Sequence, residues 1–327
     1  MPTIKDVAIK AGVSISTVSH VLNKTRFVSE DTVERVEKAI NELGYKSNIV
    51  ARSLRSNKSY RIGLLVPEIS NFFSVDIIEP IEKIVRSAGY QLVIGYSHDK
   101  LQLEKEQIDF FEQQQIDGLI LFPSEGDHTY LKQSGLAYPI VAVDRKPLGL
   151  DCDYVGGENE QAVFDAITLM ISEGHQKIGM LIGPKNLSPI EERANGYYRA
   201  LKKRGIEIDK TLIQIGGSDF KSGVEMTELL LKQKGITAIF SGNNMLTLGA
   251  LACLQKNKIS IPESVALLGF GDTMWATVTA PPLSVLRHPM AKIGEKAAKI
   301  LMERINGTNK PFQEYLFPVE LVRRSSF

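Results

Sequence analysis

The sequence has little of several features that mark common classes of protein. It has 2 cysteines and 1 tryptophan in 327 residues, and Cys152 and Cys253 are too few for a disulfide framework or a metal cluster. The 5 histidines show no metal-ligand spacing. Residues 1–6 lack the apolar stretch of a signal peptide, and no apolar run approaches membrane-spanning length. These absences predict a cytoplasmic protein with reduced thiols and no metal.

Motifs of catalysis and nucleotide binding are also missing. The chain has no P-loop and no Gly-x-Ser-x-Gly elbow, and the segment 269–272 lacks the third glycine of a dinucleotide fingerprint. His98, His128 and His175 are expected to be structural or surface residues. The sequence therefore favours a binding protein over an enzyme and predicts no cofactor.

Charge is unevenly distributed, although the formal net charge is only +1. Residues 1–60 hold ten Lys and Arg against six Asp and Glu, whereas the remaining 267 residues hold 29 against 32. Between residues 44 and 60 there are four basic residues and no acidic one. Basic charge gathered at one end favours a polyanionic partner, although a solvated surface has the same charge pattern.

Three short amphipathic helices are predicted at the N-terminus. The spacing of Ala8, Gly12 and Val18 lets the first two helices pack closely at a steep angle, as in a helix-turn-helix. An ordinary three-helix bundle is the alternative. The predicted caps and ends of the helices are Thr3 with Asp6, Gly12, Ser14, Ser29 and Gly44.

The outward face of the second helix favours DNA binding over the plain bundle. It carries short hydrogen-bonding groups and cations suited to base edges and phosphates, and no acid. The predicted DNA-contacting residues of this helix and the loop after it are Ser16, Thr17, His20, Asn23, Lys24 and Arg26.

These motifs resemble the LacI/GalR repressor family. The likeness is carried by residues 3–8, 12–14, 17–21 and 318–324, and residues 19–28 are especially similar to the purine and ribose repressors. The resemblance implies a homodimeric transcription repressor with three parts. These are a DNA-binding headpiece over residues 1–46, a hinge over 47–60, and an effector-binding and dimerisation body over 61–327. The implied partners are a palindromic operator and a small effector.

Residues 50–55 resemble the hinge helix of that family, which orders on DNA. The segment is too short to be a stable helix alone. Its Leu54 is predicted to wedge into the minor groove with Arg55 beside it. Ser47 stands where the family usually has Pro, which loosens the helix start. A plain linker is the alternative.

From residue 61 onward, buried strands alternate with helices, which predicts two Rossmann-like parallel-sheet lobes. This matches the periplasmic-binding-protein-like body that the resemblance implies. Lobe one is expected over about 61–159 and 288–317, and lobe two over 160–287 and 318–327. The predicted strands are 62–66, 91–95, 118–122, 140–143, 178–182, 212–215, 238–241 and 265–270, followed by a segment 283–288, a helix near 290–305 and a final strand.

The effector should lie in a cleft at the carboxyl ends of the strands. Arg, Asp and Asn groups bind adjacent hydroxyls, and Phe rings stack on C–H faces. For any single residue, a loop cap or a surface ion pair is the alternative. The positions that match sugar-binding members of the superfamily are Asn71, Phe73, Asp144, Arg145, Arg193, Phe220 and Asn243, with His288 where Gln is frequent.

Departures from the family pattern guide the prediction of the ligand. Asn244 and Gly271 stand where binders of neutral sugars usually have Asp, while Arg145 and Arg193 remain. We therefore expect an anionic sugar derivative. Leu187 stands where a purine-binding pocket has Arg, which disfavours a purine. The alternatives to a regulator are a sugar-binding protein without DNA function and, less favoured, an α/β enzyme.

Overall fold

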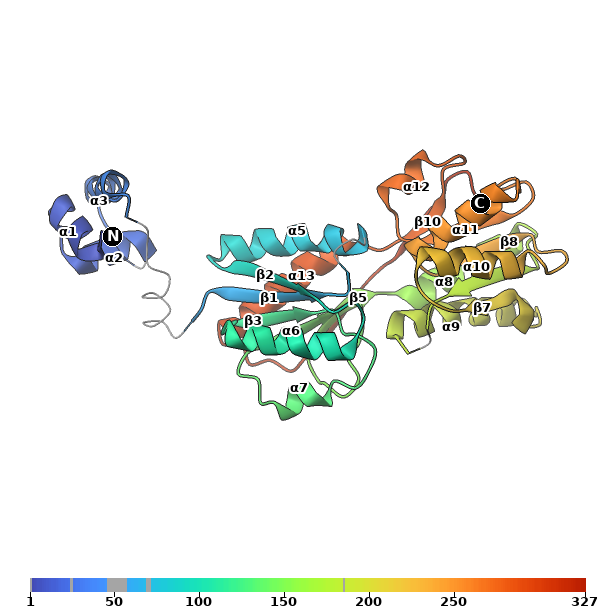
Figure 1. Cartoon of the computed structure of the whole chain (residues 1–327), viewed down its shortest axis with the longest axis horizontal. Helices are drawn as coiled ribbons and strands as arrows, with labels where there is room; N and C mark the ends of the chain where they lie inside the picture. Colours follow the sequence, from blue (N-terminus) through green and yellow to red (C-terminus); the bar gives the residue numbers. More distant parts are fainter. Residues whose placement is uncertain (1, 24–25, 46–57, 69–71, 185) are drawn as a thin grey trace. The chain divides into compact units, whose positions relative to one another are not determined.

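The computed structural model describes residues 2–23, 26–45, 58–68, 72–184 and 186–327, without the side chains of residues 23 and 72–74. The chain divides into two compact units, Met1–Ser59 and Tyr60–Phe327 (Figure 1). The predicted hinge residues Leu54 and Arg55, and the predicted contacts Lys24 and Asn71, lie outside the described residues. None of the described helices is both long and apolar enough to cross a membrane.

The first unit contains the three predicted helices, α1 (Ile4–Ala11), α2 (Ile15–Asn23) and α3 (Glu30–Leu43). Thr3 and Asp6 form the predicted capping box of α1, and Gly12 and Gly44 end α1 and α3 in the left-handed conformation. Val7, Val18 and Val36, one from each helix, are 0% exposed and form the centre of this small core. The predicted caps hold in all but one case.

The exception is Ser29 at the start of α3. Its side chain makes no cap hydrogen bond to the backbone and instead donates to the Thr32 hydroxyl at 2.9 Å. By contrast, Ser14 accepts a hydrogen bond from the Thr17 backbone N–H at 3.1 Å and so caps α2 as predicted.

The second unit holds two six-stranded sheets, each the centre of one lobe. The strand order is β11-β5-β4-β3-β1-β2 in lobe one and β12-β10-β9-β8-β6-β7 in lobe two. All pairs are parallel except β10 with β12. The strands of lobe one are β1 (Arg61–Val66), β2 (Gln91–Tyr96), β3 (Gly118–Leu121), β4 (Ile140–Val143), β5 (Asp153–Gly157) and β11 (Glu314–Phe317). Those of lobe two are β6 (Ile178–Ile182), β7 (Ile213–Ile215), β8 (Ala238–Ser241), β9 (Ala266–Phe270), β10 (Ser284–Arg287) and β12 (Glu320–Val322).

Helices cover both faces of each sheet. In lobe one, α5 (Phe72–Ser87) and α13 (Met290–Ile305) pack on one face, and α6 (Leu101–Gln113) and α7 (Thr129–Gln133) on the other. In lobe two, α8 (Asn159–Ser172) and α9 (Ser188–Lys203) lie opposite α10 (Phe220–Leu230) and α11 (Asn244–Lys256). The remaining short elements are η1 (Lys210–Leu212) and α12 (Met274–Val278). Burial on both faces explains why these strands are continuous apolar runs.

The predicted strands agree with the structure to within a residue at most ends, and the helix Met290–Ile305 has the predicted bounds. The prediction missed β5, whose sequence DYVGG begins with a charge and ends with two glycines, and it gave one final strand where the structure has β11 and β12. The chain passes between the lobes three times, after β5, after β10 and after β11.

Candidate ligand cleft and nucleic-acid interface

A cavity of about 330 Å³, here called the interlobe cleft, is lined by residues of both lobes at the carboxyl ends of their strands. Its size falls in the range typical of small-molecule sites. The polar and aromatic lining residues that matter below are Glu68, Asp99, Asp144 and Arg145 from lobe one, and Arg193, Asp219, Asn243, Asn244 and Phe270 from lobe two.

Asp144 follows β4 and is held in an unusual backbone conformation. Its φ is 63°, a left-handed value that is uncommon for a residue with a side chain. Its N–H donates to the carbonyl of Val155 at 3.0 Å, and its carbonyl accepts from the buried Tyr154 hydroxyl at 2.9 Å. The residue is only 5% exposed, and its Oδ1 has no hydrogen-bond partner among the described residues. Burial raises the pKa of this carboxyl.

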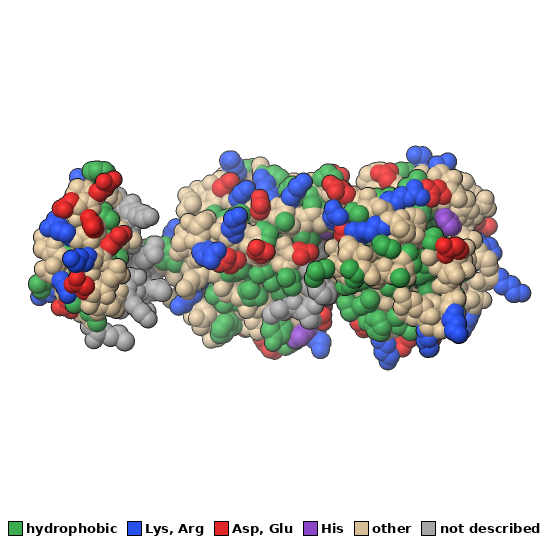
Figure 2. All heavy atoms as spheres, turned by 90° about the horizontal axis from the view of Figure 1, so that it is seen from above, with side chains coloured by type: hydrophobic (Ala, Val, Ile, Leu, Met, Phe, Trp, Pro, Cys, Tyr) green, Lys and Arg blue, Asp and Glu red, His purple; other side chains and the backbone are tan. Residues whose placement is uncertain are grey.

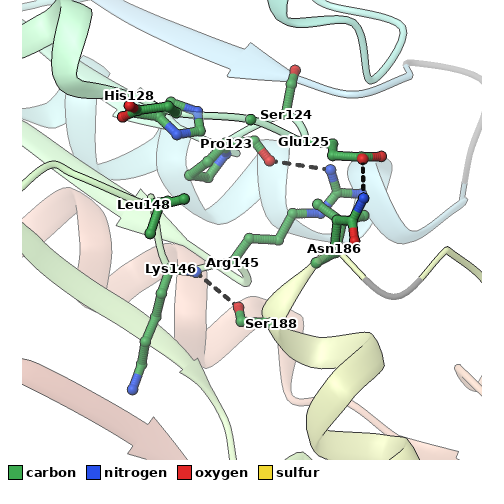
Figure 3. A pocket seen from close by; sticks show the side chains of 12 residues that line it. Pro123, Ser124, Glu125, His128, Arg145, Lys146, Leu148, Asn186 and Ser188 are labelled. Carbon is green, nitrogen blue, oxygen red and sulfur yellow. Dashed lines mark hydrogen bonds between the residues drawn. The ribbon is translucent and has the colours of Figure 1, made fainter.

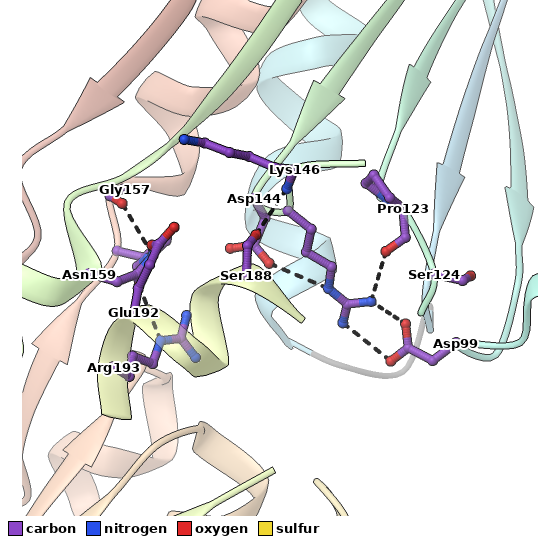
Figure 4. A network of polar contacts seen from close by, with 12 residues as sticks. Asp99, Pro123, Ser124, Asp144, Lys146, Gly157, Asn159, Ser188, Glu192 and Arg193 are labelled. Carbon is purple, nitrogen blue, oxygen red and sulfur yellow. Dashed lines mark hydrogen bonds and ion pairs between the residues drawn. The ribbon is translucent and has the colours of Figure 1, made fainter. Parts of the chain in front are cut away.

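Arg145 lies beside Asp144, but its charge is already compensated. Both terminal nitrogens pair with the Asp99 carboxylate, one of them at 3.2 Å, and a further bond reaches the carbonyl of Pro123 at 3.2 Å (Figure 4). Its Nε lies 3.8 Å from Asp144. Arg145 therefore faces the cleft as one half of an ion pair rather than as a free cation.

Arg193 projects from α9 and is held by uncharged partners. Its Nε donates to Asn159 Oδ1 at 3.1 Å, and one terminal nitrogen donates to the carbonyl of Gly242 at 2.8 Å. The guanidinium carbon lies 3.7 Å from the centre of the Phe270 ring. Burial lowers the pKa of Arg193 to about 10, so the group stays charged near neutral pH.

The sequence predicts that the charge balance of the cleft shifts toward positive, and the described lining shows no excess of positive charge. The described lining residues include the carboxylates of Glu68, Asp99, Asp144 and Asp219 and two guanidinium groups. Glu68 and Asp99 were not predicted as site residues. Both follow strands, but no motif in the sequence distinguishes them from ordinary loop residues. These carboxylates weigh against the anionic ligand that the absence of acid at positions 244 and 271 predicts.

Four predicted effector residues line the cleft, namely Asp144, Arg145, Arg193 and Asn243. Asn243 caps α11, accepting from the Leu246 N–H at 2.7 Å and donating to the carbonyl of Ser218 at 3.1 Å. The Asn243 side chain thus forms a loop cap, which is the alternative to ligand binding that the sequence leaves open. The side chain of Phe73 lies outside the described residues.

Phe220 and His288 are not among the cleft-lining residues. Phe220 is the first residue of α10 and is 40% exposed. His288 is buried behind Phe270, with ring centres 5.4 Å apart, and its Nε2 lies 3.0 Å from Asn159 Oδ1. Of the histidines expected to be structural, His128 is buried with its Nε2 3.0 Å from Glu104.

A second, smaller cavity of about 280 Å³ shares Arg145 and Leu187 with the cleft (Figure 3). At its edge the two lobes touch directly. The backbone N–H of Lys146 donates to the Ser188 hydroxyl at 3.0 Å, and the Asn186 amide donates to Glu125. These contacts span the two lobes beside the cleft.

The headpiece presents the predicted contact residues on α2 and the loop after it. Ser16 and Arg26 are exposed, and Thr17 and His20 are partly exposed. The Ser14 hydroxyl lies 2.7 Å from that of Ser16 and 2.8 Å from that of Thr17, so these hydroxyls share a local network in the free chain. The side chain of Asn23 lies outside the described residues.

Comparisons with known proteins agree with both units. Residues 3–48 match the family model "Bacterial regulatory proteins, lacI family", and residues 167–327 match "Periplasmic binding protein-like domain". Two relatives, each an "HTH-type transcriptional repressor PurR", come from Photobacterium profundum and Vibrio atlanticus. They are 33% and 32% identical to the chain, and each alignment covers 100% of this chain and 98% of the relative.

Among solved structures, a "transcriptional regulator CelR-cellobiose complex" is 29% identical with a TM-score of 0.75 and covers 100% of both chains. A lac repressor dimer bound to operator has a TM-score of 0.86 at 24% identity, covers 99% of this chain and 98% of its own, and shows the shared fold.

A helix-turn-helix headpiece in one chain with a two-lobed, ligand-sized cleft defines a DNA-binding transcription regulator with an effector-binding body. The chain belongs to the LacI family of these regulators. The regulator prediction is confirmed, and the enzyme alternative does not apply to this family.

Proposed function

We propose that the protein is a cytoplasmic, homodimeric repressor whose affinity for operator DNA is set by an uncharged sugar in the interlobe cleft. The observation that carries the proposal is that the Asp144 carboxylate and the Arg193 guanidinium line the same cavity. A sugar hydroxyl donates to a carboxylate and its neighbour accepts from a guanidinium, so adjacent hydroxyls satisfy both groups together. A buried carboxylate oxygen without a partner needs such a donor.

The charges of the cleft favour an uncharged ligand over a sugar acid or phosphosugar. Arg145 is paired with Asp99, so Arg193 is the one cation among the described lining residues that is not held by a carboxylate at ion-pair distance. An anion in the cleft would face Asp144 and the other lining carboxylates. Leu187 and Pro189 add apolar surface where a purine site would need polar groups.

For DNA, we propose that α2 lies in the major groove of each half of a palindrome. Ser16, Thr17, His20 and Asn23 would contact base edges, with Lys24 and Arg26 supporting them on the phosphates or bases. Leu54 would wedge into the central step with Arg55 in the minor groove. Two-fold symmetry of the dimer would impose the palindrome.

Exposed apolar side chains support the homodimer. Ile94 and Tyr96 on the edge strand β2 are 41% and 45% exposed, and Met274 and Val278 on α12 are 77% and 78% exposed. Hydrophobic side chains reach the surface over much of the visible face of the second unit (Figure 2). Unpaired edges and apolar surface are features that association covers.

Calorimetry with paired sugars tests the proposal. Cellobiose, D-ribose and D-glucose would be compared with D-glucuronate and glucose 6-phosphate, and DNA binding would be measured on a palindrome selected in vitro. We expect an uncharged sugar to bind, to change palindrome affinity, and to bind at least about tenfold more tightly than its charged counterpart. Tighter binding of glucuronate than of glucose would restore the anionic ligand, and binding of hypoxanthine instead would restore a purine.

A further inference from the structure

Asn159 is the first residue of α8 and is 0% exposed, and no sequence motif points to it. Its side chain uses all four of its hydrogen-bonding positions. The amide nitrogen donates to the carbonyl of Gly157 at 3.1 Å and to the Glu192 carboxylate at 2.8 Å. The amide oxygen accepts from Arg193 Nε at 3.1 Å (Figure 4). The same oxygen lies 3.0 Å from His288 Nε2.

The chemistry of the partners fixes the orientation of this amide. The carbonyl of Gly157 can only accept, and Arg193 can only donate, so nitrogen and oxygen of Asn159 cannot be exchanged. Because the Asn159 amide oxygen can only accept, its hydrogen bond with His288 requires a proton on His288 Nε2. His288 is therefore a donor in this network, and the neutral imidazole suffices because its other nitrogen need not carry a proton.

The network joins the cleft to two chain crossings. Asn159 lies at the crossing after β5, and His288 lies at the crossing after β10. Gly157 leaves room for the imidazole, because a Cβ there would lie 2.8 Å from His288 Nε2. The third crossing is adjacent, since the Glu158 N–H donates to the carbonyl of Phe317 at 2.9 Å. Two of the three crossings thus meet at the Asn159 amide, and the third lies beside it.

We propose that Asn159 is a positioning residue that acts through Arg193, holding the guanidinium in the cleft and tying it to the chain crossings. A ligand that contacts Arg193 is then coupled to the hinge between the lobes. This coupling rests on the proposed function, whereas the positioning of Arg193 does not. Asn159 does not line the cleft, so its effect on a ligand is indirect.

The positioning is tested by nuclear magnetic resonance on the full-length protein without ligand. The Arg193 Nε–H and the His288 ring are assigned with Arg193→Lys and His288→Gln. In the wild type, the Nε–H should exchange slowly with solvent and the His288 ring should carry its proton on Nε2. Asn159→Ala should speed that exchange at least about tenfold and mix the two imidazole tautomers.

Gln161→Ala is the matched control. Gln161 lies in the first turn of the same helix, is exposed, and bonds Asp165 and Arg199 rather than the cleft residues. It should leave both signals unchanged. Slow exchange and an unchanged tautomer in Asn159→Ala would overturn the positioning role.

The coupling is tested with cellobiose, D-ribose and D-glucose on the selected palindrome. The ratio of palindrome affinities with and without a bound sugar should approach one in Asn159→Ala and stay at the wild-type value in Gln161→Ala. A wild-type ratio kept by Asn159→Ala would overturn the coupling. If none of the three sugars binds the wild type, the proposed function fails on its ligand, and the resonance measurement still decides the positioning role.

Discussion

The two lobes share one strand order, yet they contribute different charged groups to the interlobe cleft. Lobe one supplies Asp144 and a closed ion pair of Arg145 with Asp99. Lobe two supplies Arg193, whose partners Asn159 and Gly242 carry no charge. The two arginines therefore have different roles. The charge of Arg145 is compensated by a carboxylate, whereas Arg193 is held by neutral acceptors and its charge remains available to a ligand.

The largest expected effect is that of removing the cation of lobe two. Arg193→Ala should weaken binding of the uncharged sugar about 100-fold, because hydrogen bonds to charged groups contribute about 1.5–3 kcal/mol and each 1.4 kcal/mol is a factor of ten. Affinity for the palindrome without sugar should stay near the wild-type value. Calorimetry measures the sugar affinity, and a DNA titration measures the palindrome affinity. An equal loss of sugar affinity in Arg145→Ala would contradict the difference between the lobes.

Asp144→Asn should weaken sugar binding by about tenfold. The amide keeps the size and one acceptor of the carboxylate but loses the charge that strengthens bonds from hydroxyl donors. The measurement is calorimetry with the sugar that binds the wild type. Unfolding should not become easier, because the buried carboxylate oxygen without a partner is itself unfavourable. A gain in sugar affinity would contradict the assignment of Asp144 to hydroxyls.

A headpiece substitution extends the comparison to a region outside both lobes. Arg26→Ala should weaken binding to the selected palindrome by about tenfold, since one good base contact contributes about 1–3 kcal/mol. Binding to random DNA should fall less, and sugar affinity should not change. Equal losses on both DNAs, measured at one salt concentration, would show that Arg26 contacts phosphates only.

The smallest expected effect comes from opening the ion pair of lobe one. Asp99→Asn removes the charge partner of Arg145, so affinity for the uncharged sugar should change by no more than about threefold. Binding of D-glucuronate should improve instead, because Arg145 then has charge to offer. Unchanged glucuronate binding would show that Arg145 is not directed at the ligand even when unpaired.

The sequence was most informative where local rules act. Caps at Thr3 and Ser14 and the glycine at Gly44 were predictable, because each satisfies backbone groups within its own turn. Most strands were predictable from apolar runs, whereas β5 was missed because its polar start and its glycines hide the run. Family likeness identified Asp144 and Arg193 as cleft residues, and both line it.

What the sequence by itself determined is therefore the class of the protein, the order of most of its elements and the strand ends that line the interlobe cleft. Only the tertiary structure decided which partner each charge has. Asp99 is 46 residues from Arg145, and Asn159 is 34 residues from Arg193 and 129 from His288. Such contacts depend on which loops the folded lobes bring together, and no local pattern records them. For the same reason the charges that line the cleft could not be counted along the chain.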